Sequence, residues 1–403
     1  MNYEGRRKGV IDALGDNSYF VFFNKRPDED ASKYATERNF LYLTGLFEFD
    51  DILLLGKHNG KPIERLYIHQ IDPMQERWTG PTIREAEAKE ISKIKHIGII
   101  DNFMNDLMNL LDESSKLYCL FKEDGTQEFS YEDFFIRTVL DKKLVTIVNG
   151  NNILKKLRSV KEEEEAQMIR KANLITWEGV KNILDNLKPG LKEYQIEAKF
   201  DEAIKYNGAT GFSFPTISAS GINSTCLHYT ANTDTLCDGD LILFDLGASL
   251  NTYCADVSRT FPVNGKFSER QKMVYEIVLN CQKMIEATAR PGYTTRDLNE
   301  LVINYFAKEL KKIGLIKDKS EVKKYYFHGV SHHLGMVCHD FCIYDQLKPG
   351  AIISNEPGLY IPEWKIGVRI EDDLYITENG CINLSAGIIK EVKDIEDYMA
   401  NRK

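Results

Sequence analysis

Two pairs of acidic residues interrupt short apolar runs in the second half of the chain, and they constrain the fold more than any other feature. Asp245 ends the run Asp240-Leu-Ile-Leu-Phe-Asp245, and Asp256 follows it eleven residues later. An antiparallel hairpin that turns at Leu250-Asn251 places these two acids directly opposite each other. Facing residues of such a hairpin have Cβ atoms only about 5 Å apart. The spacing therefore predicts a sheet in which two carboxylates meet.

A second pair of acids repeats this arrangement further along the chain. Glu356 precedes Glu371 by fifteen residues, and a turn at Glu363-Trp364 sets them opposite each other. Facing carboxylates inside a sheet repel each other and resist desolvation unless a cation or a shared proton compensates. Four such groups favour a pair of metal ions, because a shared-proton dyad needs only two acids. The alternative is that these acids line solvated strand faces.

Histidines gather in the same part of the chain. Four of the eight lie in the segment His328-Gly-Val-Ser-His332-His333-Leu-Gly-Met-Val-Cys-His339, and His228 lies upstream. A lone histidine is usually a satisfied polar residue, but four in one segment beside paired acids indicate a site. Carboxylates with one or two imidazoles are hard ligands, which favours ions like Mn²⁺ over a closed thiolate zinc site. No glutamate follows His328, so the HExxH pattern of zinc peptidases is absent.

Composition narrows the class of protein. The net charge is −9 over 403 residues, which argues against general binding of nucleic acid or an anionic membrane, because both need a positive field. We find no signal-peptide pattern and no run of the roughly 20 apolar residues that span a membrane. The eight cysteines are scattered, as is typical of a reduced protein, and we interpret Cys338 and Cys342 as core residues. We expect a cytoplasmic protein with no nucleic acid or membrane partner.

The composition changes at Asn149-Gly150-Asn151-Asn152, and we predict two domains, 1–152 and 153–403. The first alternates strands and helices, with a hairpin at Asn59-Gly60. Its predicted strands are 19–23, 52–55, 65–69, 97–100, 117–121 and 144–148, and its predicted helices lie near 102–112 and 128–139. These features predict an α/β domain.

The second domain begins with the acidic run Lys161-Glu-Glu-Glu-Glu165 and a long amphipathic helix that ends at Pro189-Gly190. We interpret the acidic run as a solvated first turn, where negative charge suits the helix dipole. Further helices are predicted at 193–206 and twice within 268–312, with strands paired through tight turns between and after them. These features predict an α+β domain.

The motifs around these acids and histidines resemble those of the pita-bread metallopeptidases, which include methionine aminopeptidase, Xaa-Pro aminopeptidase (aminopeptidase P) and Xaa-Pro dipeptidase (prolidase). They are Asn39-Phe-Leu-Tyr-Leu-Thr-Gly45 and Asp72-Pro-Met-Gln-Glu-Arg-Trp78-Thr-Gly80 in the first domain, and Leu227-His228-Tyr-Thr-Ala-Asn232, Asp245-Leu-Gly247, Ala255-Asp256-Val-Ser-Arg-Thr260, Ser331-His332-His333-Leu-Gly335, Glu356-Pro-Gly-Leu-Tyr360 and Arg369-Ile-Glu371-Asp372 in the second. The resemblance implies a creatinase-like α/β N-terminal domain and an α+β pita-bread catalytic domain.

The resemblance also implies two divalent metal ions, most simply Mn²⁺, with Co²⁺ or Zn²⁺ as alternatives. The implied ligands are Asp245, Asp256, His332, Glu356 and Glu371. Asp256 and Glu371 would bridge the ions, Asp245 would serve one ion, and His332 with Glu356 the other. A metal-bound hydroxide would attack the scissile carbonyl, and Glu356 would accept its proton.

Further roles follow from the same comparison of motifs. His228 and His339 would act in catalysis and bind the substrate, and His328 would line the pocket for proline. Arg369 lies two residues before Glu371, on the same strand face, where it would hydrogen-bond a metal carboxylate; the alternative is an ordinary surface arginine. Asp372 would point away, in a capping or surface role. Trp78 would be a core residue, a subunit contact or a wall of the specificity pocket.

The implied reaction is release of the N-terminal residue from peptides with proline second. The form Ser331-His332-x-Leu-Gly resembles Xaa-Pro aminopeptidases. Two departures are the short, prolidase-like loop between Glu356 and Arg369 and Pro81, where an arginine is common. Xaa-Pro dipeptidase is therefore the alternative, and a non-catalytic binding protein on the same fold is a remote one. We expect small peptide substrates and a homodimer or homotetramer.

Overall fold

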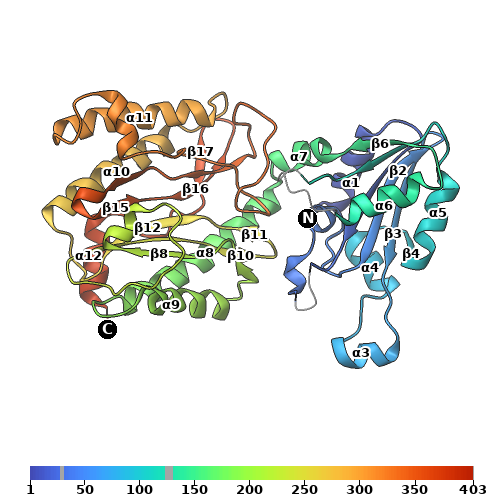
Figure 1. Ribbon diagram of the computed structural model, residues 1–403, viewed down its shortest axis with the longest axis horizontal. Helices are drawn as coiled ribbons and strands as arrows, with labels where there is room; N and C mark the ends of the chain where they lie inside the picture. The colour runs from blue at the N-terminus through green and yellow to red at the C-terminus, as the bar shows by residue number, and fades with distance from the viewer. Residues whose placement is uncertain (28–30, 123–129, 403) are drawn as a thin grey trace. The chain divides into compact units, whose positions relative to one another are not determined.

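The computed structural model describes residues 1–27, 31–122 and 130–402. The chain forms two compact units, Met1–Leu157 and Arg158–Lys403, and each is described by itself (Figure 1). The boundary predicted after residue 152 falls inside helix α7 (Asn151–Ser159). None of the described helices is long and apolar enough to cross a membrane.

The N-terminal unit is built on a six-stranded mixed sheet with strand order β4-β3-β2-β1-β5-β6. Its strands are β1 (Ser18–Asn24), β2 (Asp51–His58), β3 (Lys61–Ile68), β4 (His96–Ile99), β5 (Lys116–Cys119) and β6 (Thr146–Asn149). Each overlaps one predicted strand. The predicted hairpin is confirmed, because Asn59 and Gly60 connect β2 to β3 with φ values of 52° and 72°, which Asn and Gly tolerate best.

Helices accompany this sheet in the α/β arrangement that the sequence predicts. They are α1 (Tyr3–Ala13), α2 (Arg38–Thr44), α3 (Pro73–Thr79), α4 (Glu85–Ser92), α5 (Phe103–Leu110) and α6 (Tyr131–Leu140). The last two match predicted helices, although residues 128 and 129 lie outside the described residues. Trp78 in α3 is 86% exposed, so its interpretation as a core residue is wrong.

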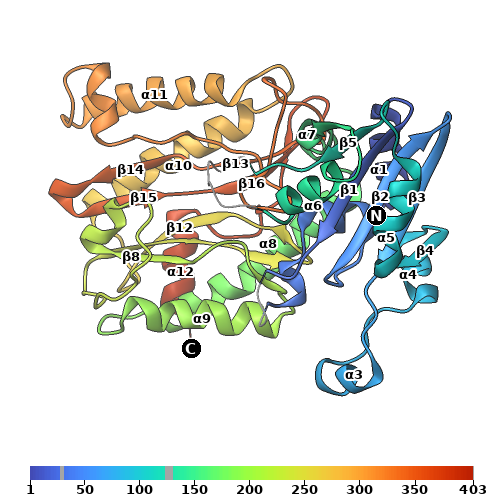
Figure 2. The ribbon, with the colours of Figure 1, turned by 45° about the vertical axis from the view of Figure 1, so that its right-hand side comes forward.

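In the C-terminal unit, short strands lie between α8 and α9 on one side and α10 and α11 on the other (Figure 1 and Figure 2). Its helices are α8 (Glu163–Asn186), α9 (Glu193–Tyr206), α10 (Glu269–Thr288), α11 (Thr295–Lys312) and α12 (Val392–Asn401). Its strands are β7 (Gly211–Phe212), β8 (Ile217–Ser220), β9 (Leu241–Leu246), β10 (Ala248–Leu250), β11 (Tyr253–Cys254), β12 (Val257–Pro262), β13 (Ile352–Asn355), β14 (Gly358–Ile361), β15 (Ile366–Arg369), β16 (Asp372–Ile376) and β17 (Cys381–Asn383). The long helix and the α+β class are confirmed.

The acidic run before α8 is only partly solvated. Glu165 is 2% exposed, and its carboxylate accepts hydrogen bonds from the Glu162 backbone N–H at 3.0 Å and the Tyr253 hydroxyl at 3.1 Å. The interpretation of the whole run as a solvated first turn is therefore wrong. Glu165 instead ties the start of α8 to β11, while its neighbours complement the helix dipole.

The register predicted for the first acidic hairpin is wrong by two residues. Asp245 on β9 pairs with Ser258 on β12, not with Asp256. The turn lies at Asn251 and Thr252, whose φ values are 49° and 72°, and Leu250 remains in strand β10. A shift of two residues preserves the strand face, so Asp245 and Asp256 still project to the same side.

The register predicted for the second hairpin is confirmed by its flanking pairs. Gly358 pairs with Arg369 and Ile361 with Ile366, while Asn355 on β13 pairs with Asp372 on β16. These pairs keep the alignment that sets position 356 opposite position 371. Residues Pro362–Trp364 and Lys365 form the turn, and Lys365 has a φ of 54°.

Gly367 on β15 allows the close approach that brings this hairpin to the rest of the unit. A Cβ at this position would lie 1.9 Å from the backbone oxygen of Ser224. We expect Gly367→Ala to lower the free energy of unfolding by about 1–3 kcal/mol, the usual cost of overpacking, measured by thermal or urea unfolding. Gly380→Ala is the control, because nothing lies within 4 Å of its Cβ position. Equal effects of the two substitutions would contradict this prediction.

Candidate metal centre and substrate cavity

The five predicted metal ligands come from different segments and line one cavity of about 490 Å³. Asp245 lies on β9, and Asp256 lies between β11 and β12. His332 precedes β13, Glu356 follows that strand, and Glu371 links β15 to β16. Each side chain thus stands on or next to a strand of the C-terminal unit, which holds it firmly.

The ligand atoms form two overlapping groups. Asp245, Asp256 and Glu371 offer carboxylate oxygens that lie within 4.8 Å of one another. A ring nitrogen of His332 and carboxylate oxygens of Glu356 and Glu371 also lie within 4.8 Å of one another. Glu371 belongs to both groups. The Nε2 atom of His332 lies 3.3 Å from Asp256 Oδ2 and 3.6 Å from Glu356 Oε1. This arrangement fits two neighbouring cations that share a carboxylate.

The clustered carboxylates of this site carry negative charge that bound cations would compensate. Burial and the neighbouring carboxylates raise the pKa of Asp245 and of Glu371, and burial raises that of Glu356 to about 7. Burial alone would lower the pKa of His332, but Asp256 and Glu356 raise it to about 9. The buried Oδ1 atom of Asp245 has no hydrogen-bond partner among the described residues. Divalent ions would satisfy these atoms and compensate their charge.

Arg369 is hydrogen-bonded to residues of this cluster. It is 3% exposed, so the interpretation as a surface arginine is wrong. Its guanidinium donates hydrogen bonds to Asp245 Oδ2, to the Ser258 hydroxyl at 2.7 Å and to the Tyr360 hydroxyl at 3.1 Å. Ser258 in turn donates to Glu371 Oε2 at 2.7 Å. Arg369 therefore orients one carboxylate of the cluster directly and a second through Ser258.

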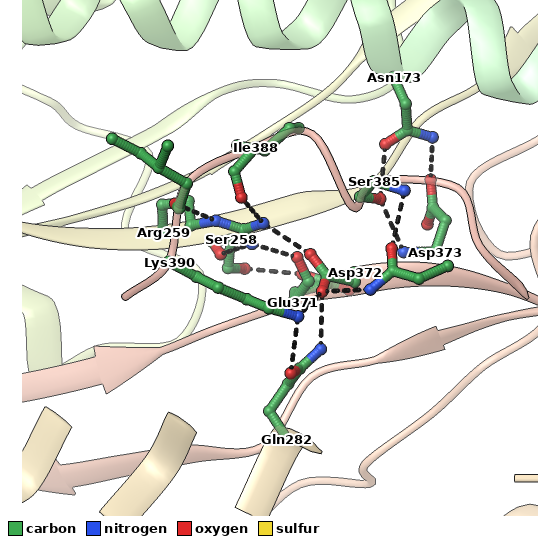
Figure 3. Close-up of polar contacts among 12 residues, drawn as sticks. Asn173, Ser258, Arg259, Gln282, Glu371, Asp372, Asp373, Ser385, Ile388 and Lys390 are labelled. Carbon is green, nitrogen blue, oxygen red and sulfur yellow. Dashed lines mark hydrogen bonds and ion pairs between the residues drawn. The ribbon is translucent and has the colours of Figure 1, made fainter. Parts of the chain in front are cut away.

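A buried ion network behind Glu371 was not predicted from the sequence (Figure 3). Asp372 is fully buried, so the expected surface role is wrong. Its carboxylate accepts hydrogen bonds from Arg259 and Lys390, both at 2.6 Å, and from Gln282 at 2.8 Å. Burial opposes ionisation, but these two cations lower the pKa of Asp372 to about 2. Arg259 also donates to the Glu371 carbonyl oxygen at 2.6 Å, which fixes the backbone beside a predicted ligand.

A second set of buried hydrogen bonds joins Asn173, Asp373 and Ser385 (Figure 3). Asp373 Oδ2 accepts a hydrogen bond from Asn173 of α8 at 2.7 Å and from the backbone N–H of Asp256 at 3.2 Å. The Ser385 hydroxyl donates to the side-chain oxygen of Asn173 at 2.7 Å. These residues link the long helix to a predicted ligand. Asn173 lies about halfway along α8, and no local motif marks it.

The three other predicted histidines line the same cavity. His339 is exposed, and its ring centroid lies 4.2 Å from that of His332. The imidazole of His328 lies 3.0 Å from the Tyr360 hydroxyl and 3.8 Å from Glu356 Oε2. Burial lowers the pKa of His328 to about 4, which keeps its ring neutral. The structure thus brings all nine predicted site residues together.

Several cavity residues were missed in the sequence. Three apolar side chains beside the cluster belong to no quoted motif, and they are Phe214, Pro215 and Ile217. Cys338 was interpreted as core, but it is half-buried and lines the cavity. Its thiol donates to Asp256 Oδ2 at 2.8 Å. Its place in the segment between His332 and His339 was the only available signal.

Mn²⁺ binding to the metal-free protein should release protons and become tighter as the pH rises toward 9. At neutral pH His332 is protonated, with a pKa of about 9, and Glu356 is partly protonated, with a pKa of about 7. Both must lose their protons to coordinate an ion. Calorimetric titrations at pH 7 in two buffers of different ionisation enthalpy would count the protons. His96→Gln, at an exposed histidine, should leave the count unchanged, whereas binding without proton release would refute the prediction.

Comparison with known proteins identifies the family to which the chain belongs. The profile of metallopeptidase family M24 matches residues 167–378, and that of the aminopeptidase P N-terminal domain matches residues 3–118. Xaa-Pro aminopeptidase of Haemophilus influenzae is 32% identical, with 98% of this chain and 96% of that protein covered.

Solved structures agree over the whole chain. A Bacillus anthracis structure superimposes with a TM-score of 0.95 at 38% identity, covering 100% of this chain and 98% of the other. Zinc-substituted Escherichia coli aminopeptidase P in complex with product superimposes with a TM-score of 0.91 at 29% identity, with the same coverage. The chain therefore belongs to metallopeptidase family M24, among its pita-bread Xaa-Pro aminopeptidases, and is a metal-dependent aminopeptidase.

Proposed function

We propose that this aminopeptidase releases the N-terminal residue from small peptides that carry proline at the second position. The observation that carries the proposal is the two overlapping ligand groups, with His228 and His339 in the same cavity. Relatives named Xaa-Pro aminopeptidase support it, such as the Escherichia coli protein, which is 30% identical over 99% of this chain. Xaa-Pro dipeptidase remains the alternative reaction.

The donor set fits two divalent ions. Asp245, Asp256 and Glu371 would hold one ion, while His332, Glu356 and Glu371 would hold the other, with Asp256 as a second bridge. Four carboxylates and one imidazole favour Mn²⁺, with Co²⁺ or Zn²⁺ as alternatives. Ions bound there would supply a hydroxide nucleophile near neutral pH.

Glu356 is the proton carrier in this proposal. It lies at the edge of the cluster, where Oε1 accepts a hydrogen bond from the Ser354 hydroxyl at 3.2 Å and Oε2 faces His328. A carboxylate so placed can accept a proton from the attacking water and deliver it to the leaving nitrogen. The hydrogen bond from Ser354 holds it in position for both transfers.

The histidines orient the peptide. His228 and His339 would donate hydrogen bonds to the scissile carbonyl and to the oxygen that becomes negative during attack. Partial desolvation of its ring and the nearby His332 lower the pKa of His339, which favours a neutral imidazole that can donate from one nitrogen. The neutral ring of His328, held by Tyr360, and the apolar side chains of Phe214 and Ile217 would contact the proline ring.

Two further parts of the proposal concern the cellular compartment and the oligomeric state of the enzyme. We propose the cytoplasm, because all eight cysteines are free thiols, as in reduced proteins. We also propose a homodimer or homotetramer in which the exposed Trp78 of α3 becomes a subunit contact or a wall of the specificity pocket.

Asp256→Asn should remove both activity and bound metal, because it deletes a bridging charge. Metal content after dialysis and hydrolysis rates in added Mn²⁺ would be measured together. Asp238→Asn, at an exposed aspartate, is the control for this variant. Normal Mn²⁺ content with full activity in Asp256→Asn would overturn the dinuclear proposal.

His228→Ala should keep the metal but slow turnover by about 10²–10³-fold, as loss of a preorganised donor does. The same two measurements, metal content and hydrolysis rate, check this prediction.

A paired assay separates the two reactions. With Mn²⁺ added, the tripeptide Arg-Pro-Pro and the dipeptide Ala-Pro are offered under the same conditions. We expect cleavage of the first bond of the tripeptide, because the proposed cavity must admit chain beyond the proline. Cleavage of the dipeptide alone would replace the proposal by Xaa-Pro dipeptidase activity. Cleavage of neither, by protein with its metal bound, would point to a non-catalytic binding protein.

A further inference from the structure

Cys338 brings a soft ligand to the edge of a site otherwise made of hard ones. Its sulfur, a carboxylate oxygen of Asp256 and nitrogens of His332 and His339 all lie within 4.8 Å of one another. Two of these distances are 2.8 Å from Cys338 Sγ to Asp256 Oδ2 and 3.3 Å from His332 Nε2 to the same oxygen. None of the predicted ions uses Cys338 or His339 as a ligand.

This quartet has the chemistry of a zinc-type site. One thiolate, two imidazoles and one carboxylate are common ligands of Zn²⁺, at bond lengths of about 2.0–2.3 Å. Ligand atoms of such a tetrahedron stand roughly 3–4 Å apart, by the same bond lengths. The quartet is already nearly that compact. His339 is exposed, so its ring can rotate to complete the tetrahedron without disturbing the core.

We propose that Asp256, His332, Cys338 and His339 form a second metal site, which takes a thiophilic divalent ion of the Zn²⁺ or Cd²⁺ class. Soft thiolate ligands select such ions over Mn²⁺. When the ion binds, the sulfur–metal bond forms as the sulfur–hydrogen bond breaks, the imidazolium of His332 gives up its proton as its nitrogen coordinates the ion, and both protons leave to water. No oxidant or other reactant is needed.

The second site competes with the first. Asp256 and His332 belong to both ligand sets, so an ion held by Cys338 leaves the hard site incomplete. The same ion also occupies His339. Thiophilic ions should therefore inhibit the enzyme through Cys338. This inhibitory consequence depends on the proposed function, whereas the binding itself does not.

The test measures binding without using activity. Metal-free protein is titrated with Cd²⁺, and the thiolate-to-cadmium charge-transfer band in the ultraviolet is recorded. The starting protein carries Cys226→Ser and Cys237→Ser, because these two cysteines are exposed and would bind Cd²⁺ on their own. We expect one equivalent of Cd²⁺ to saturate the band.

Three variants of that starting protein decide the outcome. Cys338→Ser should abolish the band, while Cys342→Ser, at a half-buried cysteine outside the quartet, should leave it unchanged. His339→Ala should keep the band and weaken Cd²⁺ binding by about tenfold or more, as loss of ligand support does. A band that survives in Cys338→Ser, or an affinity that does not respond to His339→Ala, would overturn the site.

Competition and inhibition complete the experiment. Added Mn²⁺ should weaken Cd²⁺ binding, because two ligands are shared; Cd²⁺ binding that is indifferent to Mn²⁺ would refute the shared site. Inhibition of peptide hydrolysis by Cd²⁺ is then compared with each variant's own uninhibited rate, and Cys338→Ser should require more Cd²⁺ than Cys342→Ser. Equal sensitivity would refute the inhibitory role. If the protein shows no peptidase activity, the proposed function is wrong, but the Cd²⁺ absorbance titration still tests whether the second metal site exists.

Discussion

Mutual repulsion among desolvated carboxylates is the constraint on which the catalytic unit depends. Four acidic side chains line one cavity together with the buried Arg369 and with His332, a predicted ligand, as nearby cations. Such groups resist ionisation where water is excluded, and burial accordingly raises the pKa values of Asp245, Glu356 and Glu371. Divalent ions would relieve this cost by compensating the negative charge. They would also bind more strongly, because a rigid anionic cavity holds a cation more strongly than a flexible one.

The surrounding structure keeps these acids from moving apart. Arg369 is hydrogen-bonded to Asp245, Arg259 to the backbone of Glu371, and Asp373 to the backbone of Asp256. The buried pair of Arg259 and Asp372 places a full ion pair inside the protein, where removing one partner would leave an uncompensated charge. The positions of the predicted metal ligands therefore depend on the same contacts that stabilise the whole unit. Activity and folding should be hard to separate by mutation there.

Much of this arrangement could be predicted from the residues. The turn predicted at Glu363-Trp364 aligned Glu356 with Glu371 correctly, because the observed connection, residues 362–365, is centred on the same two residues. The first hairpin was misaligned because its turn lies at Asn251 and Thr252, one residue beyond the predicted turn at Leu250 and Asn251. The error of two residues did not change the face, so Asp245 and Asp256 were still expected together. Single-residue errors would have separated them.

By itself, the sequence predicted the two-domain α/β and α+β organisation, the nine candidate site residues and a hard set of metal ligands, because local periodicity, residue chemistry and motifs shared with a known family carry that information. Only the tertiary structure decided the roles of residues whose partners are distant in sequence. Asn173 reaches Asp373, Arg259 reaches Asp372, and Cys338 reaches Asp256. Contacts of this kind depend on how separate strands and helices pack, and local patterns do not encode them. The same physical reason left Asp372 and Cys338 misinterpreted until the fold placed them beside the ligands.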